Sequence, residues 1–204
     1  MFVTFEGGEG TGKSTQIARV AGWLVGRGAE VVATREPGGT PLAEAVRAVL
    51  LDPGLAPDGL SEILLLAAAR HDNVRRLIEP ALARGAVVLA DRFTDSSLVY
   101  QGIVRGLGLA EVERLNRLAT SGIEPDRTLV LDLPVEEALA RARVRGAAGE
   151  SRLDDEPIAF HRRVREGFLE LARRDPGRVR VVDAVGTEDA VFRRVVAALE
   201  DLAP

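Results

Sequence analysis

Residues 7–14 contain the most specific chemical pattern in this chain. They read Gly-Gly-Glu-Gly-Thr-Gly-Lys-Ser, a full match to the phosphate-loop pattern G-x-x-x-x-G-K-S/T. Lys13 is also the only lysine among the 27 lysine and arginine residues of the chain. A compact ammonium that settles between two phosphates is hard to replace by a planar guanidinium. The pattern therefore predicts binding of a nucleoside triphosphate.

The residues around this loop favour a phosphate site over an unliganded glycine-rich turn. Residues 2–5 alternate like a short strand, and a helix is expected to begin near Lys13. Inward N–H groups and the positive end of the helix dipole would hold the anion. Lys13 would reach the β and γ phosphates, and the Ser14 hydroxyl would ligate Mg²⁺. The expected ATP contacts are Gly7, Gly8, Glu9, Gly10, Thr11, Gly12, Lys13, Ser14 and Thr15.

Five apolar segments are expected to form strands, each separated from the next by enough residues for a helical crossover. They are residues 2–5, 31–34, 86–90, 128–133 and 179–182. The alternation predicts an α/β fold like that of phosphate-loop NTPases, with a five-stranded parallel sheet and helices on both faces. No linker divides the chain, so we expect one domain over residues 1–204.

Composition excludes several classes of protein. A net charge of −4 argues against general nucleic-acid binding. The absence of cysteine excludes disulfides, thiolate catalysis and zinc–thiolate sites. The first residues lack a basic targeting region, and the longest apolar run, residues 63–69, is too short to cross a bilayer. We therefore expect a cytoplasmic protein with no membrane or nucleic-acid partner.

Charged residues follow two of the predicted strands. Arg35 opens the sequence Arg-Glu-Pro-Gly-Gly-Thr, where it could clamp an anion or pair with Glu36. Asp91 and Arg92 end the third strand. There Asp91 can hold Mg²⁺ through water, and Arg92 can neutralise a phosphoryl group. These residues are expected at the carboxyl edge of the sheet, where ligands gather in such folds.

The segment 96–101 reads as a helix. Ser97 precedes Tyr100 by three residues and Gln101 by four, so the three side chains are expected on one face toward the cleft. The alternative is a half-buried tyrosine beside surface hydroxyls.

Arginines surround Gly-Ala-Ala-Gly at residues 146–149, a sequence unsuited to a packed helix. We expect a lid at about residues 141–153, with a solvated basic loop as the alternative. On a continuous helix Arg141 and Arg145 would share a face and Arg143 would lie roughly opposite. The three arginines therefore could not all reach one phosphate from one helix.

In this order, the segments resemble the thymidylate kinase family of nucleoside monophosphate kinases. The likeness rests on the phosphate loop with Glu9, residues 35–40, the Ala-Ala-Arg segment at 68–70, Asp-Arg-Phe at 91–93 with Ser96 and Tyr100-Gln101, and Arg-Leu-Asp at 152–154. It implies a transferase that moves the γ-phosphate of ATP to dTMP, giving dTDP for DNA precursor synthesis. It also implies Mg²⁺ and a homodimer.

The resemblance assigns roles at the acceptor phosphate and sugar. Arg92 and Arg35 would grip the 5′-phosphate, which a guanidinium can bind with two parallel hydrogen bonds. Tyr100 would stand where a ribose 2′-hydroxyl would clash, and Glu9 would accept from the 3′-hydroxyl.

It assigns further roles at the base. Arg70 would donate to a thymine carbonyl, with Ser97 and Gln101 near the base edge. Leu66 stands where many relatives carry a phenylalanine that stacks on thymine. Since leucine can cover the base but cannot stack, Phe93 is a candidate substitute.

Among relatives, a glycine at the Gly10 position usually accompanies a catalytic arginine in the lid, for which Arg143 and Arg152 are the candidates. The expected catalytic residues are thus Lys13, Arg92, Arg143 and Arg152, with Ser14 and Asp91 as Mg²⁺ ligands. Three alternatives stay open: another nucleoside monophosphate or deoxynucleoside kinase, a non-kinase nucleotide-dependent switch, and a pure nucleotide-binding scaffold.

Overall fold

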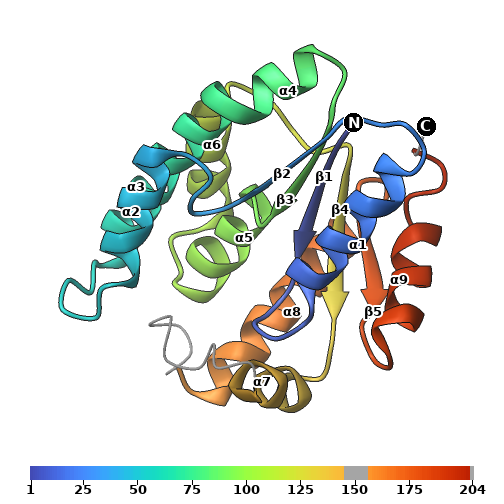
Figure 1. The fold of residues 1–204 in the computed structure, drawn as a ribbon. Coiled ribbons are helices and arrows are strands. Elements are labelled where there is room, and N and C mark those ends of the chain that lie inside the picture. The colour runs from blue at the N-terminus through green and yellow to red at the C-terminus, as the bar shows by residue number, and fades with distance from the viewer. Residues whose placement is uncertain (145–155, 203–204) are drawn as a thin grey trace.

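The computed structural model describes residues 1–144 and 156–202. Five parallel strands form one sheet in the order β2-β3-β1-β4-β5 (Figure 1). They are β1 (Phe2–Glu6), β2 (Val31–Arg35), β3 (Val87–Asp91), β4 (Arg127–Asp132) and β5 (Val179–Asp183). The structure confirms the expected parallel sheet, and each strand boundary lies within one residue of its predicted place.

Every strand ends on a charged residue at the same edge of the sheet. These residues are Glu6, Arg35, Asp91, Asp132 and Asp183. Because a parallel sheet brings all carboxyl ends to one edge, the fold gathers charge at the edge where α/β proteins bind ligands. In Figure 1 the carboxyl ends of β1 and β4 point downward.

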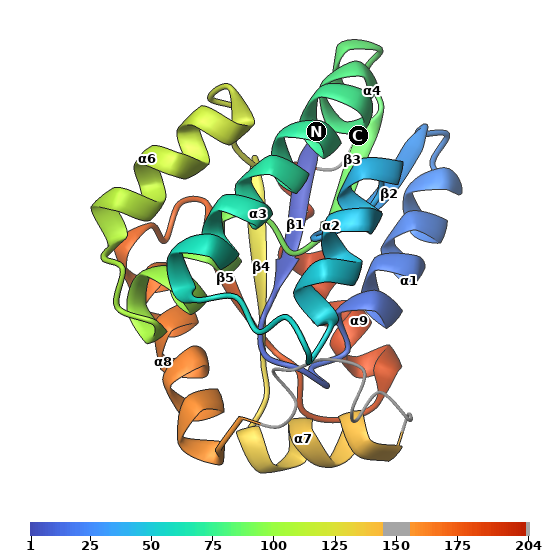
Figure 2. The ribbon, with the colours of Figure 1, turned by 90° about the vertical axis from the view of Figure 1, so that its left-hand side faces the viewer.

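Helical segments connect the strands and lie on both faces of the sheet, as expected (Figure 1). They are α1 (Lys13–Val25), α2 (Pro41–Leu51), α3 (Gly59–Asn73), η1 (Val74–Ile78), α4 (Glu79–Ala83), α5 (Thr94–Ser97), η2 (Leu98–Val104), α6 (Leu109–Thr120), α7 (Val135–Val144), α8 (Ile158–Arg174) and α9 (Glu188–Ala197). Figure 2 shows α2, α3 and α6 side by side on one flank of the molecule. Within the described ranges, no helix combines the length and apolar character needed to span a bilayer.

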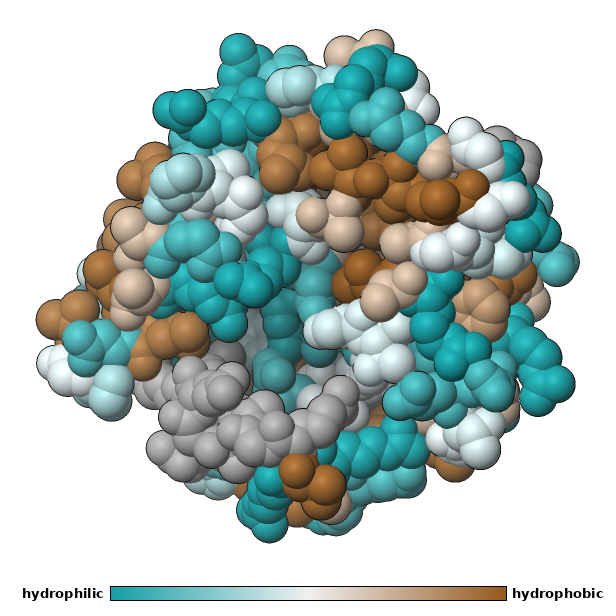
Figure 3. Space-filling view, in the orientation of Figure 1, coloured by the Kyte–Doolittle hydropathy of each residue, from teal (hydrophilic) through white to brown (hydrophobic). Residues whose placement is uncertain are grey.

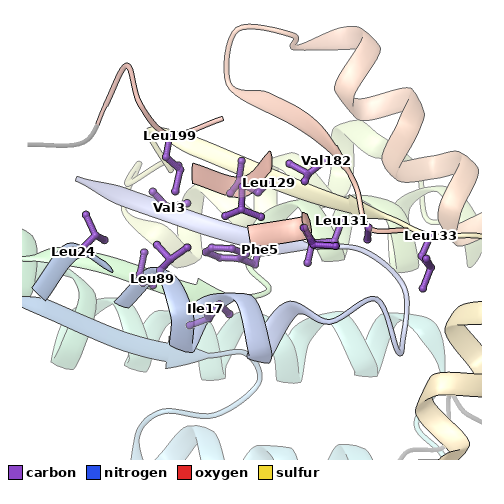
Figure 4. Packing of buried hydrophobic residues seen from close by; sticks show 14 of the residues in the cluster. Val3, Phe5, Ile17, Leu24, Leu89, Leu129, Leu131, Leu133, Val182 and Leu199 are labelled. Atoms are coloured by element: carbon purple, nitrogen blue, oxygen red, sulfur yellow. The ribbon is translucent and has the colours of Figure 1, made fainter. Parts of the chain in front are cut away.

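The core is divided by the sheet. On one face Val3 and Phe5 pack with residues of α1 and α9, including Ile17 and Leu24 (Figure 4). On the other face Phe2 packs with residues from η1, α4 and β3. Full burial of each such side chain stabilises the fold by about 1.5–3 kcal/mol. Burial on both faces therefore holds β1, which leads directly into the loop, at the centre of the molecule.

The first helix begins at Lys13, as expected. Gly12 caps it with φ +95°, and the Gly12 carbonyl accepts from Gln16 N at 3.1 Å. Its apolar residues Ile17 and Leu24 are buried, and the helix ends at the cap Gly26. A packed helix therefore fixes the position of the loop lysine.

The predicted helix at 96–101 is instead split between α5 and η2. In η2 the backbone bonds reach five residues back, as in Arg105 N to Tyr100 O at 2.9 Å. Ser97 and Gln101 both bond to residues of α3, whereas the Tyr100 ring lies toward Phe168 on α8 and toward Arg92. The structure therefore corrects the expectation that all three side chains share one face.

Candidate functional site

The phosphate loop joins β1 to α1, and two of its glycines have no room for a side chain. A Cβ on Gly7, which has φ +131°, would lie 2.6 Å from the carbonyl oxygen of Leu131. A Cβ on Gly10, which has φ +73°, would lie 1.9 Å from the carbonyl oxygen of Ala138. The loop is therefore packed directly against the backbones of β4 and α7.

Internal hydrogen bonds close the loop. Thr11 Oγ1 donates to Gly8 O at 3.0 Å. Lys13 Nζ donates to Gly8 O at 2.8 Å and to Gly7 O at 3.2 Å. Burial, reinforced by the nearby positive charge of Arg92, lowers the pKa of Lys13. The buried ammonium is held by carbonyl oxygens, a type of contact that phosphate oxygens can replace.

The first turn of α1 lies beside the end of β3. Ser14 Oγ donates to Asp91 Oδ2 at 2.8 Å, and Thr15 follows in the same turn, partly buried. Hydroxyl and carboxylate oxygens are ligands that suit Mg²⁺. Among the described residues no cluster of three or more acidic or histidine side chains supplies a complete protein cage. Phosphate oxygens and water would have to complete such a metal site.

Arg92 follows β3 and contacts the phosphate loop. Its backbone is left-handed, with φ +70°. Nη1 donates to Gly7 O and to Ser96 Oγ, both at 3.1 Å, and Nη2 pairs with Glu9. The guanidinium also lies 5.3 Å from the centroid of the Tyr100 ring.

Two side chains beside Arg92, Glu9 and Tyr100, have shifted pKa values. The positive charge of Arg92 lowers the pKa of Glu9 to about 2, although burial acts in the opposite direction. Burial raises the pKa of the Tyr100 phenol to about 12. At neutral pH Glu9 is therefore ionised and Tyr100 is a neutral phenol.

Arg70 is the most completely hydrogen-bonded arginine of the site. It is 2% exposed and donates to Glu36 Oε2, Ser97 Oγ, Asn116 Oδ1 and the Phe93 carbonyl at 2.6–3.1 Å. All five N–H groups of a guanidinium can be used by such a set. Contact between Arg70 and a bound base would therefore require one of these bonds to be exchanged.

Of the residues expected near the base, Phe93 lies in the core, whereas Leu66 and Gln101 are on α3 and η2. Leu66 is half-buried one helical turn before Arg70, and Gln101 Nε2 donates to Glu62 Oε1 at 2.5 Å. Phe93 is fully buried, and its ring packs edge-on against Phe2 at a centroid distance of 5.0 Å. The structure thus corrects the suggestion that Phe93 covers a base, because its ring belongs to the core.

Arg35 is the most exposed of the three arginines. Its side chain is 55% exposed, and Nη2 lies 3.0 Å from both carboxylate oxygens of Glu44. Glu44 also accepts from Gly39 N at 2.9 Å. The sequence left two interpretations of Arg35 open, an anion clamp or an ion pair with Glu36. In the structure Arg35 forms an ion pair with Glu44, and Glu36 pairs with Arg70 instead.

Sequence reasoning missed several residues that hold these arginines. Glu36 and Asn116 both accept hydrogen bonds from Arg70, and Glu6 interacts electrostatically with Arg92. A further arginine, Arg47 on α2, was also missed. It donates to Pro37 O at 3.1 Å, and burial together with the charge of Arg35 lowers its pKa. Only Glu36 had a local signal, because it belongs to the Arg-Glu-Pro-Gly-Gly-Thr segment.

The lid expectations are only partly within the described ranges. Arg143 is exposed in the last turn of α7, and Arg141 pairs with Glu137 at 2.7 Å. Arg145 and Arg152 lie outside the described residues.

The loop, Arg35, Asp91 and Arg92 lie at the carboxyl edge of the sheet. Figure 3 shows a hollow with a hydrophilic floor between α5 and the start of α1. A pocket also lies between the loop, β4, α7 and α8, with Glu9 and His161 in its lining. The edge of the sheet thus combines a glycine-rich loop that carries Lys13 with Arg92 beside it, an arrangement suited to two anionic ligands.

Comparison with known proteins gives a consistent result over the whole chain. Residues 5–195 match the family model described as thymidylate kinase. A thymidylate kinase of Desulfosudis oleivorans is 50% identical over 208 residues, which cover 98% of this chain and 96% of the relative. One of Geobacter sulfurreducens is 50% identical over 208 residues, covering 100% and 98%.

A solved structure agrees with these sequence matches. The crystal structure of thymidylate kinase from Ehrlichia chaffeensis superposes with a TM-score of 0.79 at 34% identity, covering 98% of each chain. Together, the family model, these relatives and this structural neighbour show that the chain belongs to the thymidylate kinase family.

Proposed function

We propose that this protein transfers the γ-phosphate of ATP to dTMP in the presence of Mg²⁺ and thereby forms dTDP. One observation in the cleft supports the proposal most strongly. Lys13 Nζ and Arg92 Nη1 donate to the same oxygen, the carbonyl of Gly7, at 3.2 and 3.1 Å. A donor-side cation and an acceptor-side cation are thus immediate neighbours, which suits transfer between two bound phosphates.

In this proposal the chain supplies charge and placement rather than covalent chemistry. Lys13 offsets negative charge that develops at the β–γ bridge, and Arg92 aims an acceptor phosphate oxygen at the γ-phosphorus. Mg²⁺, bound through Ser14 and Asp91, would supply further positive charge at the phosphates. An acceptor phosphate that is already ionised at neutral pH needs no general base.

The acceptor nucleotide would be recognised by the arginines and by Tyr100. Arg92 and Arg35 bind the 5′-phosphate, and Arg70 reaches the base by exchanging one of its contacts to Ser97. Glu9, which stays ionised down to low pH, accepts from the 3′-hydroxyl. Tyr100, held against Arg92, blocks the place of a 2′-hydroxyl.

The packing of Gly10 supports a role for a lid arginine. Because a Cβ at Gly10 would overlap the Ala138 carbonyl, the loop cannot supply an arginine from this position without displacing α7. The positive charge near the transferred phosphate would then come from Arg143 or Arg152.

We also propose a homodimer formed by the flank of α2, α3 and α6 (Figure 2). Large apolar side chains are exposed there on all three helices: Leu42, Leu60, Leu64 and Leu118 are 51–75% exposed. A second copy of the chain would cover them. Sedimentation should give twice the monomer mass of 21.8 kDa, and Leu64→Glu should shift the protein to monomers.

The decisive experiment is a nucleotide panel. The purified chain is mixed with ATP, Mg²⁺ and one of dTMP, dUMP, dCMP, dGMP or ribosyl-TMP, and ADP formation is measured. We expect the fastest release with dTMP, and release about 10³-fold slower from Lys13→Ala, which controls for contaminating kinases. A preference for dCMP or dGMP would instead indicate another nucleoside monophosphate kinase, and ATP binding without acceptor-dependent ADP release would indicate a switch protein.

A further inference from the structure

Glu6 is a buried carboxylate between the phosphate loop and the acceptor arginine. It is the last residue of β1, has no exposed surface, and directly precedes Gly7. Oε1 accepts from Phe93 N at 2.8 Å and Ser96 N at 3.2 Å. Oε2 accepts from Ser96 Oγ at 2.6 Å. All three donors belong to the turn that follows Arg92.

Ser96 connects this carboxylate to the guanidinium. Because its hydroxyl proton points to Glu6, a lone pair of Oγ is left to accept from Arg92 Nη1, at 3.1 Å. Arg92 itself has a left-handed backbone that a residue with a side chain rarely adopts. The backbone N–H groups of Phe93 and Ser96 both donate hydrogen bonds to Glu6, and these two bonds hold the chain in the turn that requires this conformation.

We propose that Glu6 is a positioning residue for acceptor binding, because it fixes the turn at residues 93–96 and the Ser96 hydroxyl that orients the guanidinium of Arg92. This inference rests on the proposed phosphotransfer function. Glu6 touches no substrate in this proposal and acts only through Ser96 and the backbone.

The charge of the carboxylate sets the direction of the hydrogen bond with Ser96. An ionised Glu6 can only accept, so Ser96 must donate to it and accept from Arg92. An amide at this position would present N–H to Ser96 Oγ, which would then face two donors and lose its fixed direction. A glutamine therefore keeps the size of the side chain but reverses this hydrogen bond.

Several titratable groups lie around Glu6. Asp95 on α5 opposes its ionisation, whereas Arg92 favours it, and Lys13 and Tyr100 lie within electrostatic range. Burial is the largest influence and, with Asp95, raises the pKa of Glu6 to about 7. The hydrogen bonds from Ser96 and Phe93 act in the opposite direction, as expected for a carboxylate that is held in place by its donors.

The test is a double-mutant cycle with Glu6→Gln, Ser96→Ala and the combined variant, in which KM for dTMP and for ATP are measured separately. We expect each single variant to raise KM for dTMP about tenfold and to change KM for ATP less than twofold. The combined variant should be no worse than the more affected single variant, because both changes break one chain of contacts.

Asp126→Asn is the matched control. Like Glu6, Asp126 accepts a hydrogen bond from a backbone N–H group. The donor is Phe2 N, at 2.7 Å, at the opposite end of β1. Asp126→Asn should leave both KM values unchanged, which separates a general loosening of β1 from an effect on Arg92.

Several results would overturn the inference. KM for dTMP within twofold of wild type in Glu6→Gln, an equal rise in both KM values, or additive effects in the combined variant would each contradict it. If Glu6→Gln does not fold, Ser96→Ala decides alone, since an unchanged KM for dTMP in that variant removes the link to Arg92. Absence of dTMP-dependent ADP release in wild type would contradict the proposed function instead.

Discussion

The two sides of the cleft are built in different ways. The proposed donor side consists of consecutive residues, and the cation of its loop, Lys13, is held by two carbonyl oxygens. The proposed acceptor side draws its arginines from three separate segments of the chain, and each already has a carboxylate partner. The pairs are Arg35–Glu44, Arg70–Glu36 and Arg92–Glu9.

This difference has a consequence for binding. A phosphate bound in the loop would replace neutral carbonyls around Lys13, whereas a phosphate bound on the proposed acceptor side would compete with carboxylates for Arg35 and Arg92. The free-energy cost of breaking such an ion pair rises with burial. The side chain of Arg70 is only 2% exposed, whereas that of Arg35 is 55% exposed. Arg70 is therefore suited to hold the architecture of the site, and Arg35 is suited to move.

The largest effects are expected from removing one cation on each side. Lys13→Ala should lower kcat by about 10³-fold, because charge at the β–γ bridge loses its nearest cation. Arg92→Ala should raise KM for dTMP by about 100-fold, since charge-assisted hydrogen bonds to the acceptor phosphate are lost. Binding of each nucleotide alone, measured by calorimetry, should show Lys13→Ala still binding dTMP and Arg92→Ala still binding ATP. Loss of both nucleotides in either variant would contradict the separation of the two sides.

The next effect concerns stability within the acceptor side. Arg70→Ala should lower the free energy of unfolding by about 3–5 kcal/mol, because it leaves Glu36 buried without its charge partner. Burial already raises the pKa of Glu36, against the effect of Arg70. Adding Glu36→Gln should therefore restore part of the loss, as urea denaturation of both variants would show. A double variant less stable than Arg70→Ala would contradict this explanation.

On the donor side, the contact between loop and α7 can be tested with a pair of glycines. Gly10 and Gly28 both have positive φ, at +73° and +87°, but only Gly10 has backbone atoms within 4 Å of its Cβ position. Gly10→Ala should therefore cost about 2–3 kcal/mol more than Gly28→Ala, from overpacking alone. Thermal unfolding of the two variants measures the difference. Equal losses would mean that α7 moves away freely.

The same contrast explains what the sequence could predict. The five strands and the loop depend on local alternation and on a contiguous pattern, and both were predicted almost to the residue. On the proposed acceptor side, Arg35 and Arg92 were predicted from their places after strands and Arg70 through resemblance, but the residues that pair with these arginines were not predicted. Their partners Glu36, Glu44 and Asn116 lie 9 to 46 residues away from them along the chain, and no local pattern indicates such pairs.

Two further differences have local causes that composition does not reveal. Residues 98–104 wind as a π-helix, which turns Tyr100 away from the face shared by Ser97 and Gln101. Phe93 follows a residue with φ +70°, and this turn directs its ring into the core beside Phe2. A sequence pattern assigns faces by assuming regular geometry, and both errors arise where the backbone departs from it.

A smaller effect is expected from pH, through Glu6. Its pKa is raised from 4.5 to about 7, so the folded protein binds more protons than the unfolded chain between these values. The contribution of Glu6 to stability is therefore complete below about pH 4.5 and is lost as pH rises through 7. Relative to wild type, Glu6→Gln should gain about 2 kcal/mol between pH 5 and pH 8. Urea denaturation at pH 5, 6.5 and 8 measures this gain, and parallel stability curves would contradict it.

The smallest effect on stability is expected at Arg35, where the comparison within the acceptor side is sharpest. Arg35→Ala removes an exposed ion pair with Glu44, which should change the free energy of unfolding by less than about 1 kcal/mol. If Arg35 leaves Glu44 to bind the acceptor phosphate, KM for dTMP should nevertheless rise about tenfold. Glu44→Gln, which releases Arg35 without removing it, should leave KM for dTMP unchanged or lower it. A rise in KM for dTMP in Glu44→Gln equal to that in Arg35→Ala would mean that the pair itself, rather than the free arginine, is what the acceptor site needs.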